Sequence, residues 1–316
     1  MIAGPIERAT HLLPQLKGKR TFKYEQGVEG CWLILWGLFK KVVIADSLAP
    51  IVKMIFDNYK SFSGISLILS VLGFTFQVYC DFSGYTDIAR GVSKLLGIEL
   101  LLNFNFPYFS KSIPEFWSRW HISLSSWLND YVFTPLALYF RYQGKNGIFI
   151  SVLITFIISG FWHGAAWHFV AWGAFHGLMY LPYVYSKQGI TSVVNNKSEN
   201  VTFKDLPRIF LTFCLVCFGY ILFRANDIGT AIGFIKHIVN SLLKHPIQIV
   251  KIPLGKMIFI YIIPLILTDW WLRTNKQYII NTKNKVIKYL IYYIVLFLCL
   301  FYLSKSDSTQ FIYFQF

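Results

Sequence analysis

Charged residues are scarce in this chain. Of its 316 residues, 14% are charged and only 15 are acidic, whereas 55% are hydrophobic and 19% are aromatic. Soluble domains carry about 25% charged residues, so this composition excludes an ordinary soluble globular fold. With a mean hydropathy of +0.49, it predicts an all-α polytopic protein that crosses a membrane several times.

Cysteines and catalytic motifs are also few. The five cysteines lie in or beside apolar runs, which argues against a disulfide framework, and Cys214 and Cys217 are expected to pack as small hydrophobic side chains. The sequence contains no Gly-x-Ser-x-Gly elbow, phosphate-binding glycine loop or zinc signature, so serine nucleophiles, nucleotide hydrolysis and a metal site are unsupported. The net charge of +15 comes mostly from Lys and Arg in short connectors. There these residues set topology and contact membrane lipids, and no nucleic acid is expected as a partner.

Apolar runs place the expected helices, roughly six to eight at membrane depth. Clear spans are predicted at residues 65–80, 148–162, 165–185, 209–223, 257–272 and 289–303. A shorter apolar run at 30–44 carries Lys40 and Lys41 and is expected to end at a headgroup layer. The amphipathic segment 227–243 is expected to lie along the surface, and residues 1–26 form a polar, basic stretch.

Asp81 and Asp87 flank Gly84 directly after the predicted span 65–80. The glycine and the two carboxylates predict a break, followed by a short helix at 88–96. The carboxylates then either cap helices at a membrane boundary or line a polar pocket, and capping is the favoured interpretation.

The segment 115–140 is too polar to face lipid on all sides and too aromatic for a free loop. It is therefore predicted to be an interfacial or re-entrant helix buried in protein. If it is helical, His121 shares a face with Trp117 and with Ser125. Arg119 and Asp130 are expected to hold this helix in place through hydrogen bonds or ion pairs.

His163 divides two apolar segments, 148–162 and 165–185, that contain no charged residue. An imidazole at membrane depth is costly, which makes His163 a candidate functional residue. The alternative is a buried histidine hydrogen-bonded to a neighbouring helix. Gly160 and Gly164 allow close approach of backbone or substrate, or a break between two helices.

His121 provides a second imidazole at this depth. One of the two could deprotonate a hydroxyl while the other polarises a carbonyl. The alternative is that His121 caps or bridges its helix through Arg119 or Asp130. His168 and His176 follow His163 by five and thirteen residues, not at the spacing of a zinc pair, so they are expected to pack or to form hydrogen bonds.

Several sequence blocks, in order, resemble the membrane-bound O-acyltransferase (MBOAT) family. These blocks are 81–91 (DFSGYTDIARG), 102–108 (LNFNFPY), 115–131 (EFWSRWHISLSSWLNDY), 159–167 (SGFWHGAAW) and 311–316 (FIYFQF). The similarity is greatest to the bacterial alginate O-acetylase-like branch, with the membrane subunit of peptidoglycan O-acetyltransferase alongside. The opening residues 2–6 resemble a motif from the middle of that family.

The resemblance implies one MBOAT-type membrane domain over residues 1–316, built as a helical ring around a central tunnel. Family members usually begin with several further spanning helices before the motif at 2–6, so the chain is expected to be N-terminally incomplete. The resemblance also matches His163 to the essential histidine of the family and His121 to its second active-site histidine.

The resulting hypothesis is an O-acyltransferase of the cell (inner, cytoplasmic) membrane, most simply an acetyltransferase. Its donor would be acetyl-CoA or another activated acyl donor reached from the cytoplasm, with no tightly bound cofactor. The acceptor would be an exported or cell-wall polysaccharide, reached through a separate extracytoplasmic acetyltransferase. The catalytic residues would be His163 and His121. The tunnel would be lined by Trp117, Trp120, Trp162, Ser125 and Asn129, with Arg119, Asp130, Asp81 and Asp87 in support.

Two alternatives from other classes stay open. One is a proton-coupled transporter in which intramembrane histidines form a relay. The other is a non-catalytic membrane scaffold for a secreted acetyltransferase. The sequence does not distinguish acetyl from D-alanyl transfer.

Overall fold

The computed structural model describes residues 4–21, 23–186, 201–244, 256, 258–275 and 284–304. All regular structure in these residues is helical, which confirms the all-α prediction. The motif block at 311–316 lies outside the described residues. The chain divides into two compact units, the first drawn from residues 1–53, 73–103 and 253–315 and the second from 54–72 and 104–252.

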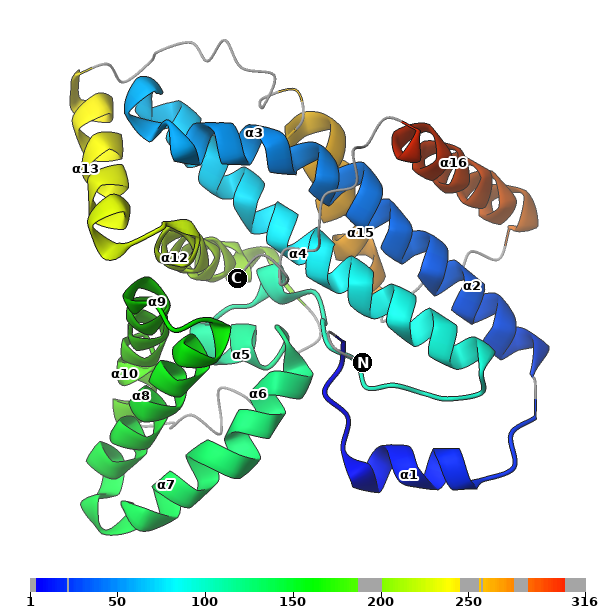
Figure 1. Cartoon of the computed structure of the whole chain (residues 1–316), viewed down its shortest axis with the longest axis horizontal. Helices are drawn as coiled ribbons and strands as arrows, with labels where there is room; N and C mark the ends of the chain where they lie inside the picture. The colour runs from blue at the N-terminus through cyan, green and yellow to red at the C-terminus, as the bar shows by residue number, and fades with distance from the viewer. Residues whose placement is uncertain are drawn as a thin grey trace. The chain divides into compact units, whose positions relative to one another are not determined.

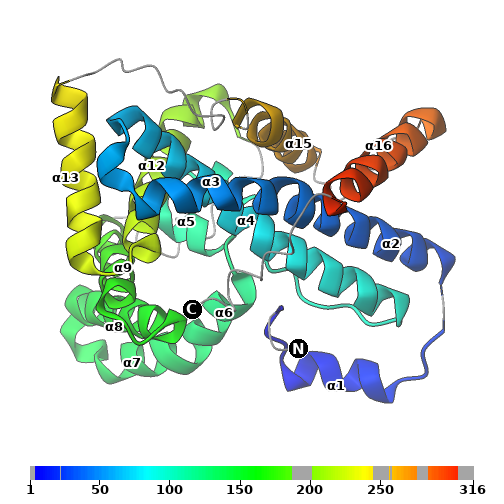
Figure 2. The ribbon, with the colours of Figure 1, turned by 45° about the horizontal axis from the view of Figure 1, so that its top comes forward.

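The first unit is built around two long helical runs. Its elements are α1 (Ala9–Lys17), α2 (Tyr24–Leu38), the π-helix η1 (Phe39–Ala45), the start of α3 (Asp46–Asp57), most of α4 (Gly64–Leu95), the π-helix η7 (Ile258–Ile262), α15 (Ile263–Thr274) and α16 (Lys285–Leu303). In both ribbon views α2 and α4 run side by side (Figure 1, Figure 2).

Glycines bring the backbones of α2 and α4 into contact. Gly30 and Gly37 on α2 are seven residues apart, as are Gly84 and Gly91 on α4, so each pair lies on one face two turns apart. A Cβ atom added at Gly37 would lie 2.5 Å from the carbonyl oxygen of Gly84, and one at Gly30 would lie 2.8 Å from that of Gly91. Only glycine fits at such a contact, which is the small-residue packing typical of membrane helices.

The predicted break at Gly84 is therefore wrong. α4 continues for 32 residues without interruption, through both aspartates, so neither aspartate caps a helix and no separate helix begins at residue 88. Gly84 serves helix–helix packing, and a glycine inside a helix is tolerated where packing offsets its low helix propensity.

Lysines of η1 neutralise the two aspartates. Lys40 is only 4% exposed, and its Nζ lies 2.5 Å from Asp87 Oδ2 and donates to Ser83 Oγ at 3.0 Å. Lys41 Nζ lies 2.6 Å from Asp81 Oδ1 and 2.8 Å from Asp46 Oδ1. The chain stays helical from Tyr24 to Asp57, so these lysines do not end a helix. Buried charges must be paired, and these pairs link the two helical runs.

We expect Asp87→Asn to lower the free energy of unfolding by about 3–5 kcal/mol, because it leaves the buried Lys40 ammonium without its carboxylate. The double variant Lys40→Met/Asp87→Leu removes both charges and should recover most of this loss. Denaturant unfolding in detergent measures both, with the exposed Lys285→Gln as control. An Asp87→Asn protein that unfolds like the control would contradict the pairing.

The second unit contains the remaining helices. They are η2 (Tyr59–Ser61), η3 (Pro107–Phe109), α5 (Ile113–Trp117), α6 (Ile122–Leu128), the π-helix η4 (Asn129–Phe133), α7 (Thr134–Tyr139), η5 (Arg141–Gln143), α8 (Gly144–His163), α9 (Trp167–Leu178), α10 (Leu181–Tyr185), η6 (Phe203–Asp205), α12 (Leu206–Arg224) and α13 (Ile228–Lys244). The helices α8 and α9 form a close hairpin. A Cβ at Gly160 would lie 2.3 Å from the carbonyl oxygen of Phe169, and one at Gly173 would lie 2.2 Å from that of Phe156.

Four helices in the described part of the chain are long and apolar enough to cross a membrane. They are Gly64–Leu95, Arg141–His163, Phe203–Arg224 and Lys285–Leu303, and they contain four of the six clear spans predicted from sequence. The predicted span 165–185 is instead divided into α9 and α10, with Pro182 in the first turn of α10, where a proline is tolerated.

The segment 227–243 lies in the helix α13, which buries Ala231 and Phe234 and exposes Ile232 and Val239. One smaller expectation needs correction. Cys214 is exposed on α12 and is not a core residue.

Candidate active site

The segment predicted as one re-entrant helix is broken at His121. α5 ends at Trp117 and α6 begins at Ile122. His121 occupies the N-cap position of α6 with φ of 45° and a left-handed backbone, which is uncommon for residues other than glycine and occurs preferentially at functional sites. Trp117 and His121 therefore do not share a helix face, and that expectation is wrong. The alternative of a capping side chain also fails, since the His121 ring makes no cap hydrogen bond.

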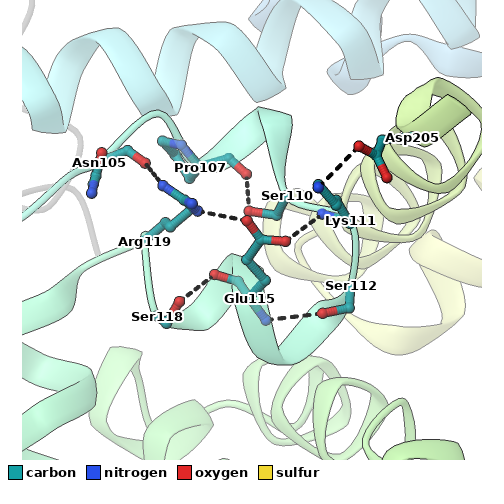
Figure 3. A network of polar contacts seen from close by, with 9 residues as sticks. All are labelled: Asn105, Pro107, Ser110, Lys111, Ser112, Glu115, Ser118, Arg119 and Asp205. Atoms are coloured by element: carbon teal, nitrogen blue, oxygen red, sulfur yellow. Dashed lines mark hydrogen bonds and ion pairs between the residues drawn. The ribbon is translucent and has the colours of Figure 1, made fainter. Parts of the chain in front are cut away.

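A network of polar contacts holds this turn (Figure 3). Arg119 Nε donates to Glu115 Oε1 at 2.9 Å, and Arg119 Nη1 donates to the carbonyl oxygen of Asn105 at 3.3 Å. The backbone N–H of Asn105 in turn donates to the carbonyl of Arg119 at 2.9 Å. Glu115 Oε2 accepts from the backbone N–H of Lys111 at 2.9 Å, while the hydroxyl of Ser112 caps α5. The buried Glu115–Arg119 pair thus ties the loop before α5 to the turn that carries His121.

Arg119 makes hydrogen bonds and an ion pair in this turn, but its partner Glu115 was missed from sequence. The spacing of four residues between an acid and a base was the available signal. Asp130 lies exposed on η4, where it accepts a hydrogen bond from the neighbouring Asn129 at 3.3 Å.

His121 and His163 both pack against Trp162. The His121 side chain is 2% exposed, and its ring centroid lies 5.9 Å from that of Trp162. His163 ends α8, with its ring edge-to-face to Trp162 at 4.9 Å and to Trp172 at 5.1 Å. Gly164 then lets the chain enter α9 past Phe169, whose ring lies 2.5 Å from the position of an added Cβ. Gly160 thus allows close contact with the backbone of Phe169, and Gly164 makes room for the Phe169 ring.

Burial lowers the pKa of His121 well below its ordinary value of 6.5, and the nearby His163 lowers it further. The ring is therefore neutral at neutral pH. A neutral imidazole offers one N–H donor and one acceptor nitrogen, so it can orient or polarise a reactant without adding a buried charge.

Two of the predicted tunnel tryptophans are joined through Phe116. Trp117 packs edge-to-face with this ring and donates from Nε1 to His176 Nδ1 at 3.4 Å, and Trp120 stacks on it. Trp162 is 51% exposed in the part of the chain that the structure describes.

A cavity of about 360 Å³ lies between α5, α6, η4 and α8. Trp117, Ser125 and Asn129 are among its lining residues, but in the described chain neither His121 nor His163 lines it. The structure thus brings three predicted tunnel residues to one cavity and the two histidines to Trp162.

The other candidates have structural partners. His168 Nδ1 lies 3.2 Å from the carbonyl of Leu222, and His176 is buried among aromatic rings, so both pack or form hydrogen bonds, as expected. Asp81 and Asp87 belong to the first unit and pair with lysines there.

Comparison with known proteins decides the family. The sequence profile described as "MBOAT, membrane-bound O-acyltransferase family" matches residues 1–222. The chain belongs to this family. Together with the four candidate spans, membership makes it a multi-pass membrane protein.

Three relatives illustrate the similarity. A probable alginate O-acetylase of Azotobacter vinelandii is 39% identical over 235 residues, which cover 73% of this chain and 44% of that protein. A peptidoglycan O-acetyltransferase of Helicobacter pylori is 35% identical over 253 residues, covering 76% of this chain and 44% of that protein. A teichoic acid D-alanyltransferase of Bacillus subtilis is 34% identical over 172 residues, covering 50% and 41%. The chain thus spans less than half the length of these relatives.

We expect Glu115→Gln to reduce acyl transfer by about 10²-fold, because a displacement of about 1 Å in a catalytic group has effects of this size. The charge-conserving Glu115→Asp should retain part of the activity. The exposed Glu25→Gln serves as the matched control. Rates are measured on protein whose folding is checked by gel filtration, and equal rates for Glu115→Gln and Glu25→Gln would contradict a positioning role.

Proposed function

We propose that this chain carries the catalytic centre of a membrane O-acetyltransferase that modifies a polysaccharide of the cell envelope. The observation that carries the proposal is that His121 and His163 pack against one Trp162 ring. Family membership supports acyl transfer. The acetyl group is favoured because the two O-acetyltransferase relatives align with about three quarters of the chain, whereas the D-alanyltransferase aligns with half.

In the proposed reaction His163 takes the proton of an acceptor hydroxyl as its oxygen attacks the acetyl carbonyl carbon. A C–O bond forms, the C–S bond of an acetyl thioester breaks, and the proton passes to the departing thiolate. His121 donates a hydrogen bond to the carbonyl oxygen as negative charge develops there. The rings of Trp172 and Phe223 pack edge-to-face on His163 and fix its orientation.

The donor we propose is acetyl-CoA or another activated acyl donor, bound as a substrate. The acceptor is an exported or wall polysaccharide, modified directly or through an extracytoplasmic acetyltransferase. Alginate and peptidoglycan are named for the relatives alone.

We expect His163→Ala to lower acetyl transfer by about 10²–10⁴-fold, the usual effect of losing one acid–base group. His121→Ala should act similarly, and the double variant should add little, because the two residues serve one step. Transfer of radiolabelled acetyl groups in membranes measures the rates, with His237→Gln as control. Retained acetylation in both single variants would favour a scaffold, and proton-coupled uptake in proteoliposomes without acetyl transfer would favour a transporter.

The pH dependence provides a separate check. Because the pKa of His121 lies well below 6.5, this residue stays neutral as the pH falls from 8 to about 6.5, the ordinary pKa of histidine. We therefore expect activity to be maintained over this range and to fall only at lower pH, where His121 becomes protonated. A profile of rate against pH whose acid limb is centred at or above 6.5 in the wild type and is lost in His121→Gln would contradict this assignment.

A further inference from the structure

A polar basin of about 820 Å³ opens in the first unit. Its lining comes from the end of α1, the connector into α2, the first turns of α2 and the residues just after α4. This region contains the basic N-terminal stretch, which the proposed acyl transfer does not use.

The walls of the basin are held by specific contacts. Gln15 Nε2 donates to the carbonyl of Glu99 at 3.0 Å, and the backbone N–H of Glu99 donates to Gln15 Oε1 at 2.8 Å. Lys94, which is 8% exposed, places its Nζ 3.0 Å from Glu29 Oε2 and 2.7 Å from Glu99 Oε1. α1, α2 and the end of α4 are thereby joined, and two carboxylates of the lining already share a buried cation.

The basic side chains of the lining are not engaged in ion pairs within the part of the chain that the structure describes. Lys19, Arg20 and Lys23 are exposed and form no ion pair with any residue that the structure describes. The stem of Arg20 lies over Gly97, where an added Cβ would come within 3.5 Å of it. The lining also contains the acids Glu25, Glu29 and Glu99. Together with Lys94, the four cations exceed these three acids by one charge, so the basin is net positive and attracts anions.

The position of the basin along α4 indicates which anion. α4 is a candidate membrane span that ends at Leu95, two residues before Gly97. Large hydrophobic side chains are exposed on the contributing segments: Leu13 and Leu16 on α1, Leu96 after α4 and Tyr24 at 77%. Lys and Arg together with Tyr and Leu at the end of a span are typical of the lipid headgroup layer.

We propose that this basin binds the phosphate of an anionic phospholipid headgroup. Lys19, Arg20 and Lys23 surround the phosphate, while the exposed leucines and Tyr24 lie against the acyl chains. The site does not depend on the proposed acyl transfer, because none of its residues belongs to the candidate active site.

The test measures binding of phosphatidylglycerol and phosphatidylcholine to the full chain in nanodiscs by native mass spectrometry. Each of Lys19→Gln, Arg20→Gln and Lys23→Gln should weaken phosphatidylglycerol binding about fivefold, and the triple variant about a hundredfold, since one cation near a membrane surface contributes about a factor of five. Binding of phosphatidylcholine should change little.

The control triple Lys236→Gln/Lys244→Gln/Lys285→Gln removes the same charge elsewhere on the chain. If the two triple variants lose phosphatidylglycerol equally, net charge explains the binding and the proposal is overturned. Inorganic phosphate at matched ionic strength forms the second arm. If it displaces the lipid from the wild type, the basin is a site for soluble phosphate anions and the lipid assignment is wrong.

Discussion

The direct contact of the α2 and α4 backbones is the constraint on which the first unit depends. Gly37 faces Gly84, and one turn further along the chain Lys40 and Lys41 reach Asp87 and Asp81. A larger residue at either glycine would separate the helices and lengthen these ion pairs. An isolated charge in an apolar interior is far more costly than a paired one. The buried ion pairs therefore depend on the close helix contact that the glycines allow. The same arrangement explains how a chain with so few acids can bury several of them.

In the second unit, a buried ion pair likewise holds the backbone in place, here around the turn at His121. A left-handed histidine is a local strain that persists only where its surroundings hold it. Here Arg119 is fixed from both sides, by the Glu115 carboxylate and by two hydrogen bonds with the backbone of Asn105. The ion pair lies two residues from His121 in sequence, so its contribution to any reaction would be indirect, through the position of the imidazole.

Sequence reasoning predicted what depends on composition and on long apolar runs. The helical class and the spans at 148–162 and 209–223 followed from hydrophobicity, which requires no knowledge of partners. Sequence reasoning failed where the neighbouring residues in the sequence suggest one role for a residue and its packing in the fold gives it another. Gly84 and its flanking aspartates read as a break because a glycine and two carboxylates normally end an apolar helix. Their partners, Lys40 and Gly37, lie more than forty residues away, and no local pattern connects them.

In the candidate site, too, some residues could be predicted from the sequence and others depend on packing. His121 and His163 were singled out because an imidazole in an apolar segment is costly wherever it lies. Their common neighbour Trp162 was named as well, but its exposure depends on what packs against it and is not encoded locally. Glu115 was passed over because a single acid before an aromatic run suggests only a helix start. What makes it important is the loop at Asn105, which folds back onto Arg119. Candidate catalytic histidines are thus recognisable from the free-energy cost of placing an imidazole in an apolar segment. The spacing of Glu115 and Arg119 could suggest an ion pair, but its role in holding the turn at His121 depends on a tertiary contact with the loop at Asn105.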